Sequence, residues 1–487
     1  MSKVRNKLIQ LSLIALALIL FGSQNPNAQT SQPEQKSYQF INGQWFDGKT
    51  FRGQTFYSVG GVLKRKKPAK VDEVIDLKNG YVIPPFADAH THHFDNPASI
   101  AQHTSMYLTD GVFYAKVLTD VRTRALKVAD KVNQPMGVDV SYAHGGLTSS
   151  FGHPMATYEG LALLRQAGGF NSEQIKQVRE SHLVENDAYY IIDTASDLEK
   201  KWSTILAGKP DLIKVYLVYS EEYQDRLKWT NAVGLTALDP KLIPLIVKKA
   251  HVAGLRVSVH VSTAFDYRAA LQAGVDEMAH LPGNLIPANS DPQKFQLTEN
   301  DAKETAKRGI WVVPAPAFSV VFDPDSKAFN AQIKERTETV RISNLKLLQK
   351  YKVKIAFGSD SFGRTPLKDV LYLKTLGVFS NLEMLKIWSE DTPQNIFPKR
   401  KIGQLIDGYE ASFLVLDGSP LVDFEQVKNI RMRFKQGYLL DLPNKNENTN
   451  HKFPYLFGDI AGRWRLEFFD HCNRANIGCG DYRGNTD

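Results

Sequence analysis

Eight short apolar runs alternate with helix-like segments through the middle of the 487-residue chain, and this alternation constrains the fold most strongly. Segments such as residues 242–254, 266–274 and 337–352 end near glycine or a basic residue, as helices do. Eight strand-helix units predict an α/β fold, a closed (β/α)₈ TIM-like barrel. The stretch between residues 145 and 211 is too long for one simple crossover. The eight runs are YVIPPFADA, GVFYAKVL, GVDVSYA, LIKVYLV, RVSVHV, DEMAHL, IWVVPAPA and VKIAFGS.

Two β-rich stretches flank this central region. The first contains the turn dipeptides Asn42-Gly43 and Gly60-Gly61, both of which are hairpin signals. A similar pattern returns near the other end, in GQLIDGYEASFLVLDGSPL and VKNIRMRFKQGYLL. We therefore expect a small β-sandwich domain built from both ends of the chain. Its parts are residues 36–83 and 402–445, the barrel is residues 84–401, and a tail of residues 446–487 follows.

The N-terminus has the pattern of a secretory signal peptide. Three basic residues precede an apolar run over residues 8–21, and small and polar residues follow. We exclude residues 1–29 from the fold and expect an exported protein, periplasmic or secreted, with no stable membrane insertion after cleavage. An uncleaved anchor is the alternative, which is disfavoured because a spanning helix needs about 20 apolar residues.

The positions of the two cysteines and the net charge indicate a candidate disulfide and the kind of partner to expect. Cys472 and Cys479 both lie near the C-terminus, where in an oxidising compartment we predict that they form a disulfide. The net charge of +8 is mildly basic. No Lys/Arg-dense stripe with interleaved aromatic residues is present, so nucleic acid is not an expected partner.

Candidate reactive residues stand at the C-terminal ends of five expected strands, which is where such barrels carry their chemistry. Alone, each has an ordinary explanation, such as a hydrogen-bonded core histidine or a solvated lysine. Together they suggest a metal site, because imidazole and carboxylate suit Zn²⁺, Mn²⁺, Fe²⁺ or Co²⁺. His90 and His92, two positions apart on one strand, point to the same face. The others are Lys214, His260, His280 and Asp360.

At these residues the chain resembles the amidohydrolase superfamily of metal-dependent hydrolases, and within it the prolidase-like and imidazolonepropionase-like members with a carboxylated lysine. The resemblance covers the chain from the small β domain to about Leu440. It departs at Pro84-Pro85, where the family usually has Pro-Gly, and at Ala411-Ser412, where Ala-Asp is common. The matching pieces are YVIPPFADAHTHH, LIKVYL, VSVHVSTAFDYRAALQAGVDEMAHL, FGSD and IGQLIDGYEASFLVLDGSPL.

The resemblance implies a binuclear metal centre. It makes His90, His92 and Asp360 ligands of a more buried divalent ion, and His260 and His280 ligands of a more exposed one. Lys214, carboxylated by CO₂, is then the bridge. Zn²⁺ is the first expectation for both ions, with Mn²⁺, Fe²⁺ or Co²⁺ as alternatives.

A lysine can play this part only as a carbamate, because an ammonium group has no lone pair. Desolvation and two nearby cations favour the neutral amine of Lys214, which can then add CO₂. Two metal ions can hold a hydroxide between them. That hydroxide is expected to attack a carbonyl polarised by the exposed ion, and Asp360 to carry its proton to the leaving group as general acid and base.

Four further residues are weaker candidates. His153, in SSFGHP, resembles the Gly-His element that peptidase-like members carry after strand three, so it is a candidate for substrate contact; an ordinary loop histidine is the alternative. Tyr219 could polarise a carbonyl or merely line the pocket. Arg364 lies on the rim where it could bind a substrate carboxylate, if it is not simply solvated. His93 points away from the ligand face and is expected to pack.

The leading hypothesis is an exported hydrolase of C–N bonds in a peptide-like or cyclic amide, with a dipeptide as the first guess. A mononuclear deaminase or imidazolone-type ring hydrolase is the second hypothesis. Deaminases often place glutamate three residues after the strand-five histidine, where this chain has Thr263. A non-catalytic metal- or ligand-binding protein is the third, and the presence of Asp360 argues against it. The sequence leaves substrate and oligomeric state open.

Overall fold

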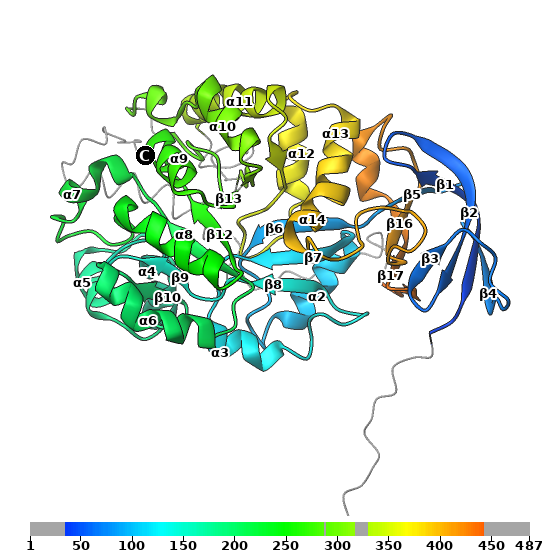
Figure 1. Ribbon diagram of the computed structural model, residues 1–487, viewed down its shortest axis with the longest axis horizontal. Helices are drawn as coiled ribbons and strands as arrows, with labels where there is room; N and C mark the ends of the chain where they lie inside the picture. Colours follow the sequence, from blue (N-terminus) through cyan, green and yellow to red (C-terminus); the bar gives the residue numbers. More distant parts are fainter. Residues whose placement is uncertain (1–34, 287–288, 317–329, 443–487) are drawn as a thin grey trace, which may run out of the picture.

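The computed structural model describes residues 35–286, 289–316 and 330–442. The expected signal peptide, residues 1–29, and the tail, residues 446–487, with Cys472 and Cys479, lie outside the described residues. The described chain is a mixed α/β structure with parallel sheets, as the alternation of strands and helices predicted. In Figure 1 a smaller sheet, coloured blue and orange, occupies one end of the molecule.

The parallel strands form two sheets, with the orders β6-β7-β8 and β10-β9-β11-β12-β13-β14-β15. Each of the eight apolar runs contains or overlaps one of these strands, so their prediction as strands is confirmed. Strands β6, β7 and β11 are buried at every position, which explains why they are apolar throughout rather than alternating. The strands are β6 (Phe86–Thr91), β7 (Val112–Val117), β8 (Asp139–Tyr142), β9 (Gly146–Thr148), β10 (Tyr189–Ile191), β11 (Leu212–Tyr216), β12 (Arg256–His260), β13 (Glu277–Met278), β14 (Trp311–Val312) and β15 (Lys354–Ile355).

Two features link the two parallel sheets. Only residues 143–145 separate β8, in one sheet, from β9, in the other. At the opposite edge, the chain that follows β15 pairs with β6. The Ala89 amide donates to the Phe357 carbonyl at 2.8 Å, and the Asp360 amide donates to the His90 carbonyl at 2.7 Å. The segment that follows the last parallel strand, β15, is therefore hydrogen-bonded to the first, β6.

The helices pack around these strands (Figure 1). The expected helical segments coincide with α8, α9 and α11, and the long stretch from 145 to 211 holds β9, α4, α5, β10 and α6. Among the described residues, no helix has both the length and the hydropathy to cross a membrane. The helices are α2 (Ile100–Thr109), α3 (Arg122–Ala125), α4 (Met155–Leu164), α5 (Ser172–Glu180), α6 (Ala195–Ala207), α7 (Tyr223–Arg226), α8 (Ile243–Val252), α9 (Ala264–Ala273), α10 (Glu299–Lys307), α11 (Ala331–Lys350), α12 (Leu367–Thr375), α13 (Asn381–Lys386) and α14 (Thr392–Ile396).

The small sheet combines both ends of the described chain, with the order β18-β17-β16-β5-β1-β2-β3 and β4 also on β1. It has its own hydrophobic cluster, which includes Phe40, Trp45, Phe413 and Phe434. Hydrogen bonds join all eight strands into one sheet, whereas we expected a sandwich, because β1 pairs with β2 along one side and with β4 and then β5 along the other. The strands are β1 (Tyr38–Phe46), β2 (Phe51–Val59), β3 (Val62–Lys64), β4 (Glu73–Asp76), β5 (Tyr81–Ile83), β16 (Phe413–Leu416), β17 (Ile430–Lys435) and β18 (Tyr438–Leu439).

One of the two turn predictions in this sheet is wrong. Gly60-Gly61 does join β2 to β3, with positive φ angles of 57° and 72°. Asn42-Gly43, however, lies inside β1, where the register with β2 shifts between Phe40 and Gly43. A Cβ atom on Gly43 would lie 2.6 Å from Trp45 Nε1, so the dipeptide makes a bulge that lets the buried indole pass close to the backbone.

Candidate metal centre

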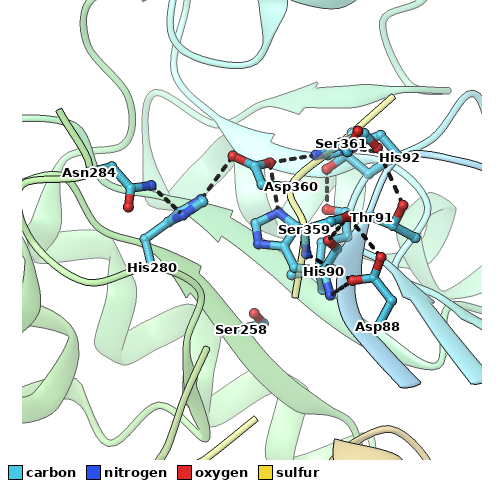
Figure 2. A network of polar contacts seen from close by, with 12 residues as sticks. Asp88, His90, Thr91, His92, Ser258, His280, Asn284, Ser359, Asp360 and Ser361 are labelled. Atoms are coloured by element: carbon cyan, nitrogen blue, oxygen red, sulfur yellow. Dashed lines mark hydrogen bonds and ion pairs between the residues drawn. The ribbon is translucent and has the colours of Figure 1, made fainter. Parts of the chain in front are cut away.

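Three histidines and Asp360 meet at the carboxyl ends of the parallel strands (Figure 2). His90 Nε2 lies 3.3 Å and His92 Nε2 3.2 Å from Oδ1 of Asp360, while His280 Nε2 lies 3.9 Å from Oδ2. Ligand atoms of His90, His280 and Asp360 all lie within 4.8 Å of one another, as one shared ion requires. The two residues at i, i+2 on β6 and beyond it therefore face the same carboxylate, which follows β15, the last of the parallel strands.

The other two candidate histidines, His260 and His153, lie next to this cluster on the side of His280. The rings of His260 and His280 have centroids 4.5 Å apart, and those of His260 and His153 5.0 Å. His153 is also 5.0 Å from the Tyr216 ring. The structure thus brings His153, a weak candidate, next to the more exposed end of the histidine cluster.

Lys214 lies on β11 and is fully buried. Among the described residues its Nζ has no hydrogen-bond partner, and the Tyr216 ring lies 5.1 Å away. Burial lowers the pKa of Lys214 from 10.5 to about 7. A buried amine that is half deprotonated near neutral pH and lacks a partner is a group that can add CO₂.

The charges of the cluster suit a cation. Burial lowers the pKa values of His90 and His260 well below the ordinary value, so both rings are neutral at pH 7 and keep a lone pair for a metal. Burial alone would raise the pKa of Asp360, but the imidazole nitrogens that face its carboxylate, among them the hydrogen-bonded His92, stabilise the ionised form and hold that pKa well below its usual range. An ionised carboxylate among neutral imidazoles is a donor set of the kind that divalent ions bind.

A buried carboxylate, Asp88, holds the backbone behind the ligands. Its Oδ1 accepts from the amides of His90 at 3.1 Å and Ser359 at 3.0 Å, and its Oδ2 accepts from the hydroxyls of Tyr107 and Ser359, each at 2.8 Å. Burial raises the pKa of Asp88 to about 6. One side chain therefore ties β6 to the segment that carries Asp360, and no pattern in the sequence indicated this role.

Two of the ligand candidates lie beyond their strands in backbone conformations that side chains rarely adopt. His280 has φ of 148° and Asp360 has φ of 49°. Such strained residues persist where their surroundings dictate the conformation, and they gather at functional sites. At Gly358 a Cβ atom would lie 2.7 Å from that of His90, so only glycine allows the two segments to approach this closely.

The cluster opens into a cavity of about 170 Å³. His90, His92, His260, His280 and Asp360 form its polar floor. Much of its wall is aromatic, and the Phe362 ring stacks on His92 at 4.6 Å. Among the described residues, no lysine or arginine lines it. The aromatic side chains are Tyr158, Tyr216, Tyr219, Phe295 and Phe362.

Of the other residues predicted from the sequence, one lines the cavity and two do not. Tyr219 lines the cavity, as expected. Arg364 does not line it; its guanidinium pairs with the buried carboxylate of Asp369, so the expected contact with a substrate carboxylate has no support from the geometry. His93 is buried outside the cavity, with Nδ1 2.5 Å from Thr91 Oγ1 and 3.0 Å from the Tyr107 hydroxyl. The sequence did not single out Tyr158 or Phe362.

Comparison with known proteins bears on the fold. No family model matches the chain. Ochratoxinase from Aspergillus niger is 25% identical over 213 residues, which are 42% of this chain and 42% of that protein. The chain thus matches about two fifths of the length of this curated relative.

Solved structures match over a larger part of the chain. The crystal structure of A. niger ochratoxinase has a TM-score of 0.63 at 18% identity and covers 84% of this chain and 96% of its own. A Xaa-Pro dipeptidase with bound methionine in the active site gives 0.60 at 17% identity, covering 83% and 100%. A structure described as an amidohydrolase gives 0.61 at 19%, covering 84% and 99%.

The chain has the amidohydrolase fold. The resemblance expected from the sequence motifs is thereby confirmed at the level of the fold. In this fold five of the motif residues, His90, His92, His260, His280 and Asp360, line one cavity, and the buried Lys214 lies against Tyr216, which lines it as well.

Replacing His93 should spare metal binding, whereas replacing His92 should not. His92 Nε2 points at Asp360, while His93 hydrogen-bonds to Thr91 and Tyr107 away from the cavity. Metal analysis of purified protein should therefore find wild-type content in His93→Ala and reduced content in His92→Ala. Equal loss of metal in two variants that are both folded would contradict this division.

Replacing Lys214 with methionine should stabilise the metal-free protein. Keeping a lysine with a pKa of about 7 instead of 10.5 buried costs on the order of 4 kcal/mol at pH 7, and methionine removes this cost. The advantage should shrink as pH rises from 7 toward 10.5, because over that range the unfolded wild type holds the proton that the folded protein has lost. Thermal unfolding in CO₂-free, chelator-treated buffer measures it. A variant less stable than wild type at pH 7 would contradict this account of Lys214.

Proposed function

We propose that this protein is an exported, metal-dependent hydrolase that cleaves a C–N bond in a small amide or short peptide. The observation that carries the proposal is the convergence of four histidines and an ionised aspartate on one cavity, with the buried Lys214 against the lining residue Tyr216 and its Nζ without a hydrogen-bond partner among the described residues. Buried polar atoms normally have partners, and Nδ1 of His90 and Nζ of Lys214 have none among the described residues, which favours a bound ion nearby. Export follows from the N-terminal sequence pattern alone.

We infer that the two parallel sheets form one closed (β/α)₈ barrel. Support comes from the hydrogen bonds between β6 and the chain after β15, the parallel bridge between Thr91 and Ser361, and the short connection from β8 to β9. Closure would place the carboxyl ends of all the strands around one rim. It would explain why residues as distant in sequence as His92 and Asp360 contact each other.

Two divalent ions fit the residues that are present. His90, His92 and Asp360 would hold the more buried ion, and His260 and His280 the more exposed one, with Lys214 as a carbamate between them. Zn²⁺ is our first choice, because neutral imidazole and carboxylate are its usual ligands besides thiolate. When bound, such ions lower the pKa of water and polarise a carbonyl group.

The protein's own side chains would transfer the proton, contact the substrate and exclude water. Asp360, ionised and within reach of the imidazoles, can take a proton at Oδ and pass it to the leaving nitrogen. His153 and Tyr219 line the cavity and could contact the substrate. The aromatic wall would hold an apolar part of the substrate and exclude water from the reacting bond.

The neighbours' names support a C–N bond as the target. They include a Xaa-Pro dipeptidase and an amidohydrolase. We therefore propose a screen of metal-reconstituted protein against dipeptides, N-acyl amino acids, cyclic amides and lactones. Turnover of at least one amide, with loss of turnover in chelator and recovery on adding Zn²⁺, is the expected result.

Asp360→Asn tests the mechanism on whichever amide the screen identifies. Asparagine keeps the shape and a ligand oxygen but cannot hold the proton, so kcat should fall by about 10²- to 10⁴-fold. Steady-state kinetics and metal analysis of the same sample measure this. The matched control is Asp417→Asn, which changes an exposed carboxylate paired with Arg431 in the small sheet and should leave kcat unchanged. A variant that retains its metal and hydrolyses as fast as wild type would overturn the role of Asp360.

A further inference from the structure

A side chain outside the proposed ligand set faces one of the ligands. Asn284, in the loop after β13, places its amide nitrogen 2.8 Å from Nδ1 of His280 (Figure 2). The other ring nitrogen, Nε2, is directed at Asp360, 3.9 Å away. His280 therefore has one nitrogen turned toward the cluster and the other turned toward the Asn284 amide.

The chemistry of a histidine ligand decides what this contact must be. A neutral imidazole that binds a metal through Nε2 carries its proton on Nδ1, and that proton needs an acceptor. His92 meets this requirement, because its Nδ1 lies 3.0 Å from the Thr119 carbonyl, a group that can only accept. His280 instead faces an amide, which accepts through its oxygen and donates through its nitrogen.

We propose that Asn284 is a positioning residue that sets the tautomer of His280 by presenting its amide oxygen to Nδ1–H in the metal-loaded protein. A half-turn of the amide exchanges oxygen and nitrogen and leaves the shape of the side chain almost unchanged. With the nitrogen facing the ring, the proton would sit on Nε2, where it would block the lone pair that the ion needs. This inference rests on the proposed metal site.

The loop is built to hold Asn284 in this place. Arg341 on α11, 2% exposed, donates from Nη2 to the Asn284 carbonyl at 2.8 Å and from Nη1 to the Tyr372 hydroxyl at 2.7 Å. Two residues further on, the Ile286 amide donates to Thr337 Oγ1 on the same helix at 3.0 Å. With its backbone fixed at both points, the Asn284 side chain keeps its contact with His280.

The choice of asparagine also has a physical reason. A neutral amide oxygen can accept the imidazole proton without adding another negative charge beside Asp360 and a carbamate. The φ of 148° at His280 shows that the loop imposes a costly backbone conformation on this residue. The strained turn at His280 and the pinned Asn284 thus fix both the position of the ring and the site of its proton.

The test compares two substitutions of similar shape at this position. Asn284→Leu removes every acceptor, while Asn284→Asp supplies only acceptors. We expect Asn284→Leu to weaken binding of the second Zn²⁺ by about 10- to 100-fold, the usual effect of losing a partner behind a ligand, and Asn284→Asp to bind close to wild type. Titration of metal-free protein against a chromophoric chelator measures both affinities without relying on activity. Thr157→Val, a change in the cavity wall, is the matched control and should bind as wild type does.

Three results would overturn the inference. The first is an Asn284→Asp variant that loses as much affinity as Asn284→Leu, when circular dichroism and thermal unfolding show both to be folded. The second is an Asn284→Leu variant with wild-type affinity. The third is a wild type that binds no second ion at all, which would overturn the proposed binuclear site itself and is distinguishable because no variant is needed to see it.

Discussion

A primary amine buried without a partner is the constraint on which this structure depends. Lys214 stands in the middle of β11, and no described residue hydrogen-bonds to its Nζ. A buried ammonium in that position would cost several kcal/mol, and the shift of its pKa to about 7 expresses the same cost. A further group must therefore offset this cost. The nearby imidazoles and Asp360 point to bound metal ions as that group.

The surrounding structure brings the compensating groups together from distant parts of the chain. Asp88 ties the His90 strand to Ser359, and so places Asp360 against His90 and His92. Parallel pairing does the same on the other side, where Lys214 and Tyr216 are in register with Ser258 and His260. The proposed ligands are therefore brought together by strand pairing, which adds distant residues to the local His90–His92 pair.

The sequence predicted these parts where a periodic pattern carried the information. Apolar runs located eight of the ten described parallel strands, all but β9 and β10, and the i, i+2 spacing placed His90 and His92 on one face. Prediction from the sequence failed where contacts between side chains determine the local structure. Asn42-Gly43 became a bulge because Trp45 must pass close to Gly43, and Arg364 turned to Asp369, which no short-range pattern could reveal. Asp88 and Asn284 act through single contacts with residues that only the fold makes neighbours.

The measurement that tests this account most directly is ¹³C NMR of the protein reconstituted with Zn²⁺ and ¹³C-bicarbonate, with metal counted in the same sample. The account predicts two ions per chain and a carbamate carbonyl resonance that is absent from Lys214→Met. Two bound ions with no carbamate resonance in the wild type would contradict the central claim that Lys214 is buried in order to bridge them.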